Sequence, residues 1–166
     1  CDGSTCRIAS ASTSGMHGRR PTMRATARCE AAADAPTNLR ATLTEIRLDL
    51  RTGMSRRREL ASGLSLEAGT VNRTLLGRRT RYAYLAIAEP WPRCRGVAKV
   101  DLATGEALAV HQYGTGWFGG KASFVPAAGC KEREDEGHVV VMVHDEAAST
   151  SELAVLDAVT MEAVTT

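Results

Sequence analysis

The sequence of 166 residues predicts an all-β fold, and three observations support that class. Apolar and polar residues alternate in short stretches, a strand-and-turn unit recurs along the chain, and 43% of the residues are hydrophobic while only 4% are aromatic. A core built mainly from Ala, Val and Leu suits short packed strands better than a large aromatic pocket.

Residues 1–38 have neither the period of a helix nor that of a strand. They are rich in Ser, Thr, Ala and Arg, and Ile8 is their single large aliphatic residue. Such a segment buries too little apolar surface to offset the entropy lost on ordering, so we predict a disordered N-terminal segment over residues 1–38. Its Arg and Ser content also resembles that of a plastid or mitochondrial transit peptide.

The first strand-like pattern begins near Leu43. Residues 45–50 alternate charged and apolar side chains in the order EIRLDL, which predicts a strand with one buried and one wet face. Residues 49–53 then form a turn, because Gly53 adopts a positive φ without steric cost.

The same strand and turn recur twice. Asp101 follows the strand-like residues 97–100, and Asp157 follows a weaker copy that begins at Leu153, so the aspartates at 49, 101 and 157 are 52 and 56 residues apart. More apolar strands, residues 82–88 and 139–144, precede the second and third copies. A unit of this size predicts blades of a β-propeller over residues 39–166. The inner strand of the first blade then has to lie within residues 1–38.

Bulk properties select no macromolecular partner. The net charge is +2, so we predict no nucleic-acid partner and interpret the arginine clusters at 56–58 and 78–81 as solvated side chains. No apolar run approaches the roughly 20 residues of a membrane-spanning helix. The cysteines are odd in number and scattered, which indicates free thiols: Cys1, Cys6, Cys29, Cys94 and Cys130.

Few titratable residues suggest a site. His138 and His144 share a strand face but stand about 20 Å apart, too far for one ion, and His111 has no companion ligand. The acidic run 132–136 is interpreted as a solvated loop. Glu67 differs, because a carboxylate in an apolar stretch needs a donor, and the ring N–H of a metal-bound histidine is one such donor.

Several stretches, in order along the chain, carry a family resemblance: LTEIRLDLRTG at 43–53, the segment 66–92 ending in AEPWP, GVAKVDL at 96–102, FGG at 118–120, FVP at 124–126, EDEG at 134–137 and VHDE at 143–146. They resemble plant carotenoid cleavage dioxygenases, most closely the 9-cis-epoxycarotenoid dioxygenases of abscisic acid synthesis. The resemblance covers roughly three quarters of the chain and implies a seven-bladed propeller, of which this chain holds about three late blades.

The resemblance also implies a chemistry. The family holds Fe(II) with four histidines, orients them with outer-shell glutamates, and uses O2 to cleave a polyene double bond, giving xanthoxin from 9-cis-epoxycarotenoids in plastids. None of the four ligand motifs stands in this sequence; one is expected just beyond Thr166 and an earlier pair upstream of Cys1. We therefore expect no catalytic or metal-ligating residue in this chain, and no bound iron.

Two outer-shell positions carry over from the family. Glu67 matches a glutamate that accepts the N–H of a ligand histidine. The family pattern Gly-Gly-Glu-Pro reads Gly119-Gly120-Lys121-Ala122 here, so Lys121 replaces a second glutamate. Lysine has only donors and a positive charge, and cannot accept a histidine N–H.

The N-terminal segment has a further explanation through the family. A family peptide that carries the remaining ligand histidine, read one nucleotide out of register, yields residues 2–19. We therefore hypothesise a frameshift within residues 1–38, in which case the transit-peptide composition is accidental and His17 has no ligand role.

These observations predict a fragment of a 9-cis-epoxycarotenoid dioxygenase-like protein that is itself inactive and belongs to plastids by resemblance. The alternative is a non-catalytic propeller fragment that acts by protein association, for example with an intact homologue. A basic nucleic-acid module is a weaker alternative.

Overall fold

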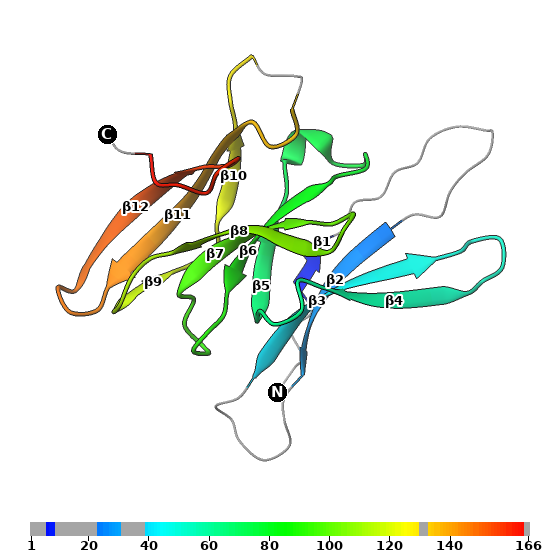
Figure 1. Cartoon of the computed structure of the whole chain (residues 1–166), viewed down its shortest axis with the longest axis horizontal. Helices are drawn as coiled ribbons and strands as arrows, with labels where there is room; N and C mark the ends of the chain where they lie inside the picture. Colours follow the sequence, from blue (N-terminus) through cyan, green and yellow to red (C-terminus); the bar gives the residue numbers. More distant parts are fainter. Residues whose placement is uncertain (1–5, 9–22, 31–38, 130–132, 165–166) are drawn as a thin grey trace.

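The computed structural model describes residues 6–8, 23–30, 39–129 and 133–164. Within these ranges the protein is all-β, as predicted (Figure 1). The strands are β1 (Cys6–Ile8), β2 (Met23–Glu30), β3 (Arg40–Leu48), β4 (Ser55–Leu60), β5 (Leu66–Thr70), β6 (Tyr82–Ile87), β7 (Gly96–Asp101), β8 (Glu106–Gln112), β9 (Trp117–Gly119), β10 (Ser123–Pro126), β11 (Gly137–Asp145) and β12 (Thr150–Asp157), with one short 3-10 helix, η1 (Arg73–Leu75). No helix in the described ranges is long and apolar enough to cross a membrane.

The strands form three antiparallel sheets of four strands each. The first sheet has the order β1-β2-β3-β4 and the second the order β5-β6-β7-β8. In the third, β12 pairs with one edge of β11, while β9 and β10 pair with different parts of its other edge. The second sheet lies between the other two in Figure 1.

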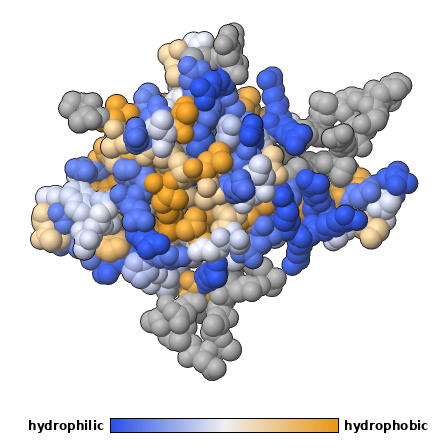
Figure 2. Space-filling model, in the orientation of Figure 1, coloured by the Kyte–Doolittle hydropathy of each residue, from blue (hydrophilic) through white to orange (hydrophobic). Residues whose placement is uncertain are grey.

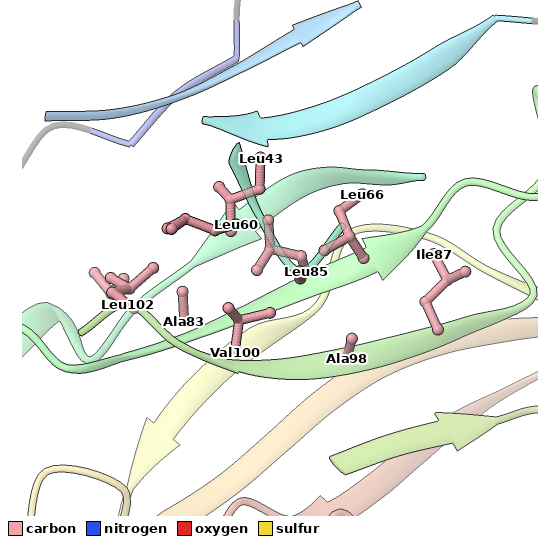
Figure 3. Packing of buried hydrophobic residues seen from close by; sticks show 11 residues of the cluster. Leu43, Leu60, Leu66, Ala83, Leu85, Ile87, Ala98, Val100 and Leu102 are labelled. Carbon is pink, nitrogen blue, oxygen red and sulfur yellow. The ribbon is translucent and has the colours of Figure 1, made fainter. Parts of the chain in front are cut away.

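The first and second sheets pack through aliphatic side chains (Figure 3). Leu43 and Leu60 of the first sheet meet one face of the second sheet, where Leu85 and Val100 are fully buried. Successive side chains of a strand point to opposite faces, so the residues that alternate with these along β6 and β7 lie on the other face of the second sheet. There Tyr84 and the other buried residues of a second cluster join the second and third sheets: Val97, Ala122, Phe124, Val139, Val141, Val143, Leu156, Ala158 and Met161.

The predicted aspartate turns are confirmed at all three positions. In each turn the carboxylate of Asp49, Asp101 or Asp157 accepts hydrogen bonds from the backbone N–H groups two and three residues later, at 2.8–3.3 Å. A threonine three residues after each aspartate then accepts the N–H two residues beyond it, at 3.2–3.4 Å. Asp145 makes the same carboxylate contacts, and the sequence pattern missed it because Ala148, not a threonine, stands three residues later.

The fifth residue of each repeated turn has a left-handed backbone. Gly53 and Gly105 occupy it at φ of 71° and 86°, and Met161 occupies it in the third copy at φ of 64°. The weak third copy therefore keeps the turn geometry without glycine. At Gly105 the space is also restricted, because an added Cβ would lie 2.9 Å from Cδ2 of Leu60.

The first sheet supplies the inner strands that the repeat required within residues 1–38. β2 pairs with β3 over eight residues, from Met23 opposite Arg47 to Glu30 opposite Arg40, and β1 pairs with β2. At these two strands the structure differs from the expected disorder, because pairing with the apolar-patterned β3 provides backbone partners that the local composition does not reveal. The rest of residues 1–38, including His17, lies outside the described residues, and the frameshift remains a hypothesis.

A buried ion pair joins the second and third sheets. Nζ of Lys99 on β7 lies 2.7 Å from Oδ2 of Asp135, and both side chains are more than nine-tenths buried. Neighbouring Glu134 accepts the backbone N–H groups of Arg81 and Tyr82. The expectation that residues 132–136 form a merely solvated loop is therefore wrong for residues 134 and 135, because their partners lie more than 30 residues away in sequence.

The pKa of Asp135 is set by burial and by the cations beside it. Burial alone would raise the pKa of Asp135, but the hydrogen bond and charge of Lys99, helped by Arg133, hold it below the ordinary value. The carboxylate thus remains ionised at neutral pH, and Lys99 keeps its partner.

Replacing Asp135 with asparagine is expected to lower the free energy of unfolding by about 3–5 kcal/mol at pH 7, because it leaves Lys99 buried without a counter-charge. Denaturant unfolding of both proteins measures the difference. Glu146→Gln is the matched control, since it breaks the exposed Arg93–Glu146 pair and should cost at most about 1 kcal/mol.

The pH dependence provides a second measurement on the same variant. The folded pKa of Asp135 is depressed, so its contribution is complete above the unfolded value of about 3.9 and is lost as pH falls through the folded pKa. Wild-type stability should fall more steeply than that of Asp135→Asn below about pH 4. Equal slopes would contradict a charged Asp135.

Gly105→Ala is expected to destabilise the protein by about 1–3 kcal/mol more than Gly53→Ala. Both substitutions strain a positive-φ position, but only the alanine at 105 meets Leu60, whereas nothing lies within 4 Å of an added Cβ at 53. Thermal unfolding of the two variants checks the difference, and equal losses would argue against tight packing at Leu60.

Candidate functional site

Glu67 lies on β5, the first strand of the second sheet, opposite Ala86. The pairing of β5 with β6 shifts register between Glu67 and Thr70, and Ala68 within this bulge has φ of 49°. A bulge re-aims the side chains next to it. Glu67 is half-buried, so its carboxylate is partly removed from water and needs a donor.

The donor in this structure is a thiol. Sγ of Cys94 lies 3.7 Å from Oε1 of Glu67, and Cys94 is a buried free cysteine. Burial first, and then the charge and hydrogen bond of Glu67, raise the pKa of the Cys94 thiol to about 11. The sulfur therefore stays protonated at neutral pH and donates its proton toward the carboxylate. Within the described residues, Oε2 of Glu67 has no hydrogen-bond partner.

Cys94 also connects Glu67 with the segment that carries Lys121. Its carbonyl oxygen accepts the N–H of Gly119 at 2.8 Å, and the two residues form an isolated bridge. Glycine is required at 119, because a Cβ there would lie 2.5 Å from the Tyr113 ring. Lys121 follows two residues later and is exposed. In the part of the chain that the structure describes, its amine has no hydrogen-bond or ion-pair partner.

The histidines do not join this arrangement. Nδ1 of His111 lies 3.1 Å from the carbonyl oxygen of Met161, and Nδ1 of His144 lies 3.0 Å from Oγ of Ser151. His138 lies opposite Asp157 on the neighbouring strand. Across the described ranges, no three His, Cys, Asp or Glu side chains are grouped so that they could hold a metal ion. The described residues by themselves therefore do not fit an iron centre.

A cavity of about 250 Å³ opens between the second and third sheets. His111, Tyr113 and Trp117 line it together with residues of β11, β12 and the segment 163–164. The hydroxyl of Tyr113 is buried and has no hydrogen-bond partner among the described residues. Glu67, Cys94 and Lys121 do not line this cavity, so it is separate from the Glu67 arrangement.

The sequence proposed Glu67 and Lys121 as site residues but not Cys94. Its thiol was grouped with the other scattered cysteines, because no local spacing links position 94 with position 67. Only the pairing of β5 with β6, and the return of the chain past β6 into the bridge with Gly119, bring Cys94 beside the carboxylate.

The amino-acid sequence of this chain is similar to those of known proteins. Residues 4–166 match the family model described as RPE65: Retinal pigment epithelial membrane protein. The chain is 44% identical over 125 residues to the chloroplastic 9-cis-epoxycarotenoid dioxygenase NCED6 of Arabidopsis thaliana, an alignment that covers 75% of this chain and 21% of that protein. It is 42% identical over 118 residues to the chromoplastic zeaxanthin 7,8(7',8')-cleavage dioxygenase of Crocus sativus, covering 68% of this chain and 32% of that one.

Solved structures agree on the fold. A point variant of Synechocystis apocarotenoid oxygenase superposes with a TM-score of 0.77 at 21% identity, covering 94% of this chain and 34% of that chain. Cobalt-substituted Synechocystis ACO gives a TM-score of 0.74 at 21% identity, with coverages of 84% and 31%. The chain thus spans between a fifth and a third of the length of these proteins. Its matched family model and its relatives together place it in the RPE65 family, whose members include carotenoid cleavage dioxygenases.

Proposed function

We propose that this chain is part of a carotenoid cleavage dioxygenase that retains one outer-shell carboxylate of the iron site, Glu67, and does not itself cleave carotenoids. The supporting observation is the geometry of Glu67. The carboxylate projects from a bulge on the first strand of its sheet, with one oxygen engaged by Cys94 and the other without a partner in the described residues. A carboxylate in this state has an acceptor available for a histidine N–H.

The residue at position 121 supports the same proposal. A glutamate there would accept a hydrogen bond from the ring N–H of a second ligand histidine. The ammonium of Lys121 instead offers only donors and repels a divalent cation. Loss of one outer-shell partner typically costs about 10- to 100-fold in metal affinity or activity. A site completed around this segment would therefore hold its metal more weakly than a site with both carboxylates.

The relatives suggest the substrate class and the compartment. A 9-cis-epoxycarotenoid dioxygenase and a zeaxanthin cleavage dioxygenase both act on long apolar polyenes, and both are named as plastid proteins. We infer a carotenoid substrate for the complete protein, with cleavage of 9-cis-epoxycarotenoids in abscisic acid synthesis as the specific reaction and the plastid as its location.

A role by protein association is the alternative. The third sheet exposes large apolar side chains, with Met142 and Leu153 both more than half exposed. Exposed apolar surface on a sheet favours contact with another protein surface. This role requires no metal and is independent of Glu67.

Purified protein incubated with Fe(II) and then desalted is expected to retain far less than one iron per chain and to cleave no 9-cis-epoxycarotenoid. The reason is that the described residues contain no set of metal ligands, which one carboxylate and one thiol cannot replace. Metal analysis and chromatographic detection of apocarotenoid products measure the two quantities. Stoichiometric iron together with product would contradict the proposal.

Glu67→Gln is expected to speed alkylation of Cys94 at pH 8.5, because removing the negative charge lowers the pKa of the neighbouring thiol. Peptide mapping after iodoacetamide treatment follows Cys94 separately from the other cysteines. Glu106→Gln, on an exposed position of β8, is the matched control and should leave the rate unchanged. An unchanged rate in Glu67→Gln would show that the carboxylate does not contact the thiol.

A further inference from the structure

The contact between Cys94 and Glu67 depends on the placement of a connecting segment, because Cys94 lies outside the strands. It belongs to residues 88–95, which join β6 to β7. The N–H of Arg95 donates to the carbonyl oxygen of Ile87 at 3.0 Å and closes the base of this connection. That bond lies within the second sheet and does not by itself set the direction of the Cys94 side chain.

Arg93, the residue before Cys94, fastens the connection to the third sheet. Its Nη2 lies 2.8 Å from Oε1 of Glu146, and its Cζ lies 4.9 Å from the centre of the Phe118 ring. A cation over an aromatic face is attracted to the ring, so the guanidinium has two partners at once. Successive side chains of an extended chain point to opposite sides. Arg93 can therefore engage the third sheet while Cys94 faces Glu67.

The partners of Arg93 belong to the same unit that bridges Cys94. The aromatic partner directly precedes Gly119, whose N–H donates to the carbonyl oxygen of Cys94. The acidic partner, Glu146, donates its own N–H to the carbonyl oxygen of Gly116 at 3.1 Å, just before β9. Because β9 also pairs with β11, these groups form one supported unit, and β9 lies beside the second sheet in Figure 1. Arg93 and Cys94 thus contact neighbouring points of that unit.

The Arg93 contacts act on local orientation rather than on global stability. The side chains of Arg93 and Glu146 are 52% and 41% exposed, and exposed ion pairs contribute little to the free energy of unfolding. Figure 2 shows hydrophilic side chains at the surface where the second and third sheets meet, in keeping with an exposed pair. Two simultaneous contacts nevertheless restrict the direction of a long side chain, and with it the direction of the adjacent residue.

We propose that Arg93 is a positioning residue for the Glu67 arrangement. By binding Glu146 and Phe118 it holds Cys94 against Glu67, so that one carboxylate oxygen stays engaged and the other stays available. The inference rests on the proposed function, in which the available oxygen accepts the N–H of a ligand histidine. It assigns a role to a side chain that acts on the carboxylate only through its neighbour in the chain.

The infrared S–H stretching band of Cys94 tests the proposal, because a thiol that donates to a carboxylate absorbs at lower frequency than a free thiol. Subtracting the spectrum of the matching Cys94→Ala protein isolates this band from those of the other cysteines. Glu67→Gln replaces the charged acceptor with a weaker neutral one and should move the band to higher frequency. Arg93→Gln should move it in the same direction. Arg93→Lys, which keeps a cation for both partners, should leave it close to the wild-type position.

A matched control and a double variant separate positioning from a general structural effect. Arg133→Gln removes another exposed arginine that is paired with a carboxylate, and should leave the band unchanged. In the Glu67→Gln background, Arg93→Gln should shift the band much less than it does in the wild type, because the contact through which it acts is already weakened. Thermal unfolding establishes that each variant is folded.

The spectra have outcomes that contradict the proposal directly. A band that Arg93→Gln leaves in place, or shifts equally with and without the Glu67 carboxylate, would overturn it. A band insensitive to Glu67→Gln would overturn it as well, because the thiol then makes no contact with the carboxylate. The proposed function is tested separately by iron retention and product formation, which these spectra do not measure.

Discussion

The burial of the second sheet on both faces is the constraint on which the rest of this structure depends. Residues 83–88 and 96–102 are buried almost without exception, which a single sheet in water cannot achieve. The first sheet covers one face with Leu43 and Leu60, and the third covers the other with Phe124 and Val139. The aliphatic composition suits this arrangement, because Ala, Val and Leu allow sheets to pack closely on both sides.

Polar contacts fix the orientation of these layers rather than supplying most of the burial. The guanidinium of Arg58 on β4 bonds Glu45 in its own sheet and reaches the carbonyl oxygens of residues 102–104 in the second. Lys99 and Asp135 make the corresponding link between the second and third sheets. Burial and ion pairing oppose each other at Asp135, and the pairing prevails, so this link stays charged. Each interface thus combines an aliphatic contact with directional polar anchors.

The candidate site depends on the same packing. Glu67 belongs to the edge strand β5, and its carboxylate meets Cys94 only because the chain between β6 and β7 returns to bridge Gly119. The arrangement brings the two proposed outer-shell positions, 67 and 121, into connected segments. Position 67 keeps its carboxylate, whereas position 121 carries the cationic side chain of Lys121.

The sequence by itself determined the all-β class and the three aspartate turns, because these depend on alternation and on local hydrogen bonds within short windows. It also proposed Glu67 and Lys121 as site residues from the order of short motifs. The tertiary structure alone decided the strands within residues 1–38, the burial of Asp135 and the contact of Cys94 with Glu67. Each of these requires a partner distant in the chain: β3 for β2, Lys99 for Asp135, and the β5 bulge for Cys94. A local pattern contains no information about a partner that only folding brings near, so these features had no signal in the sequence.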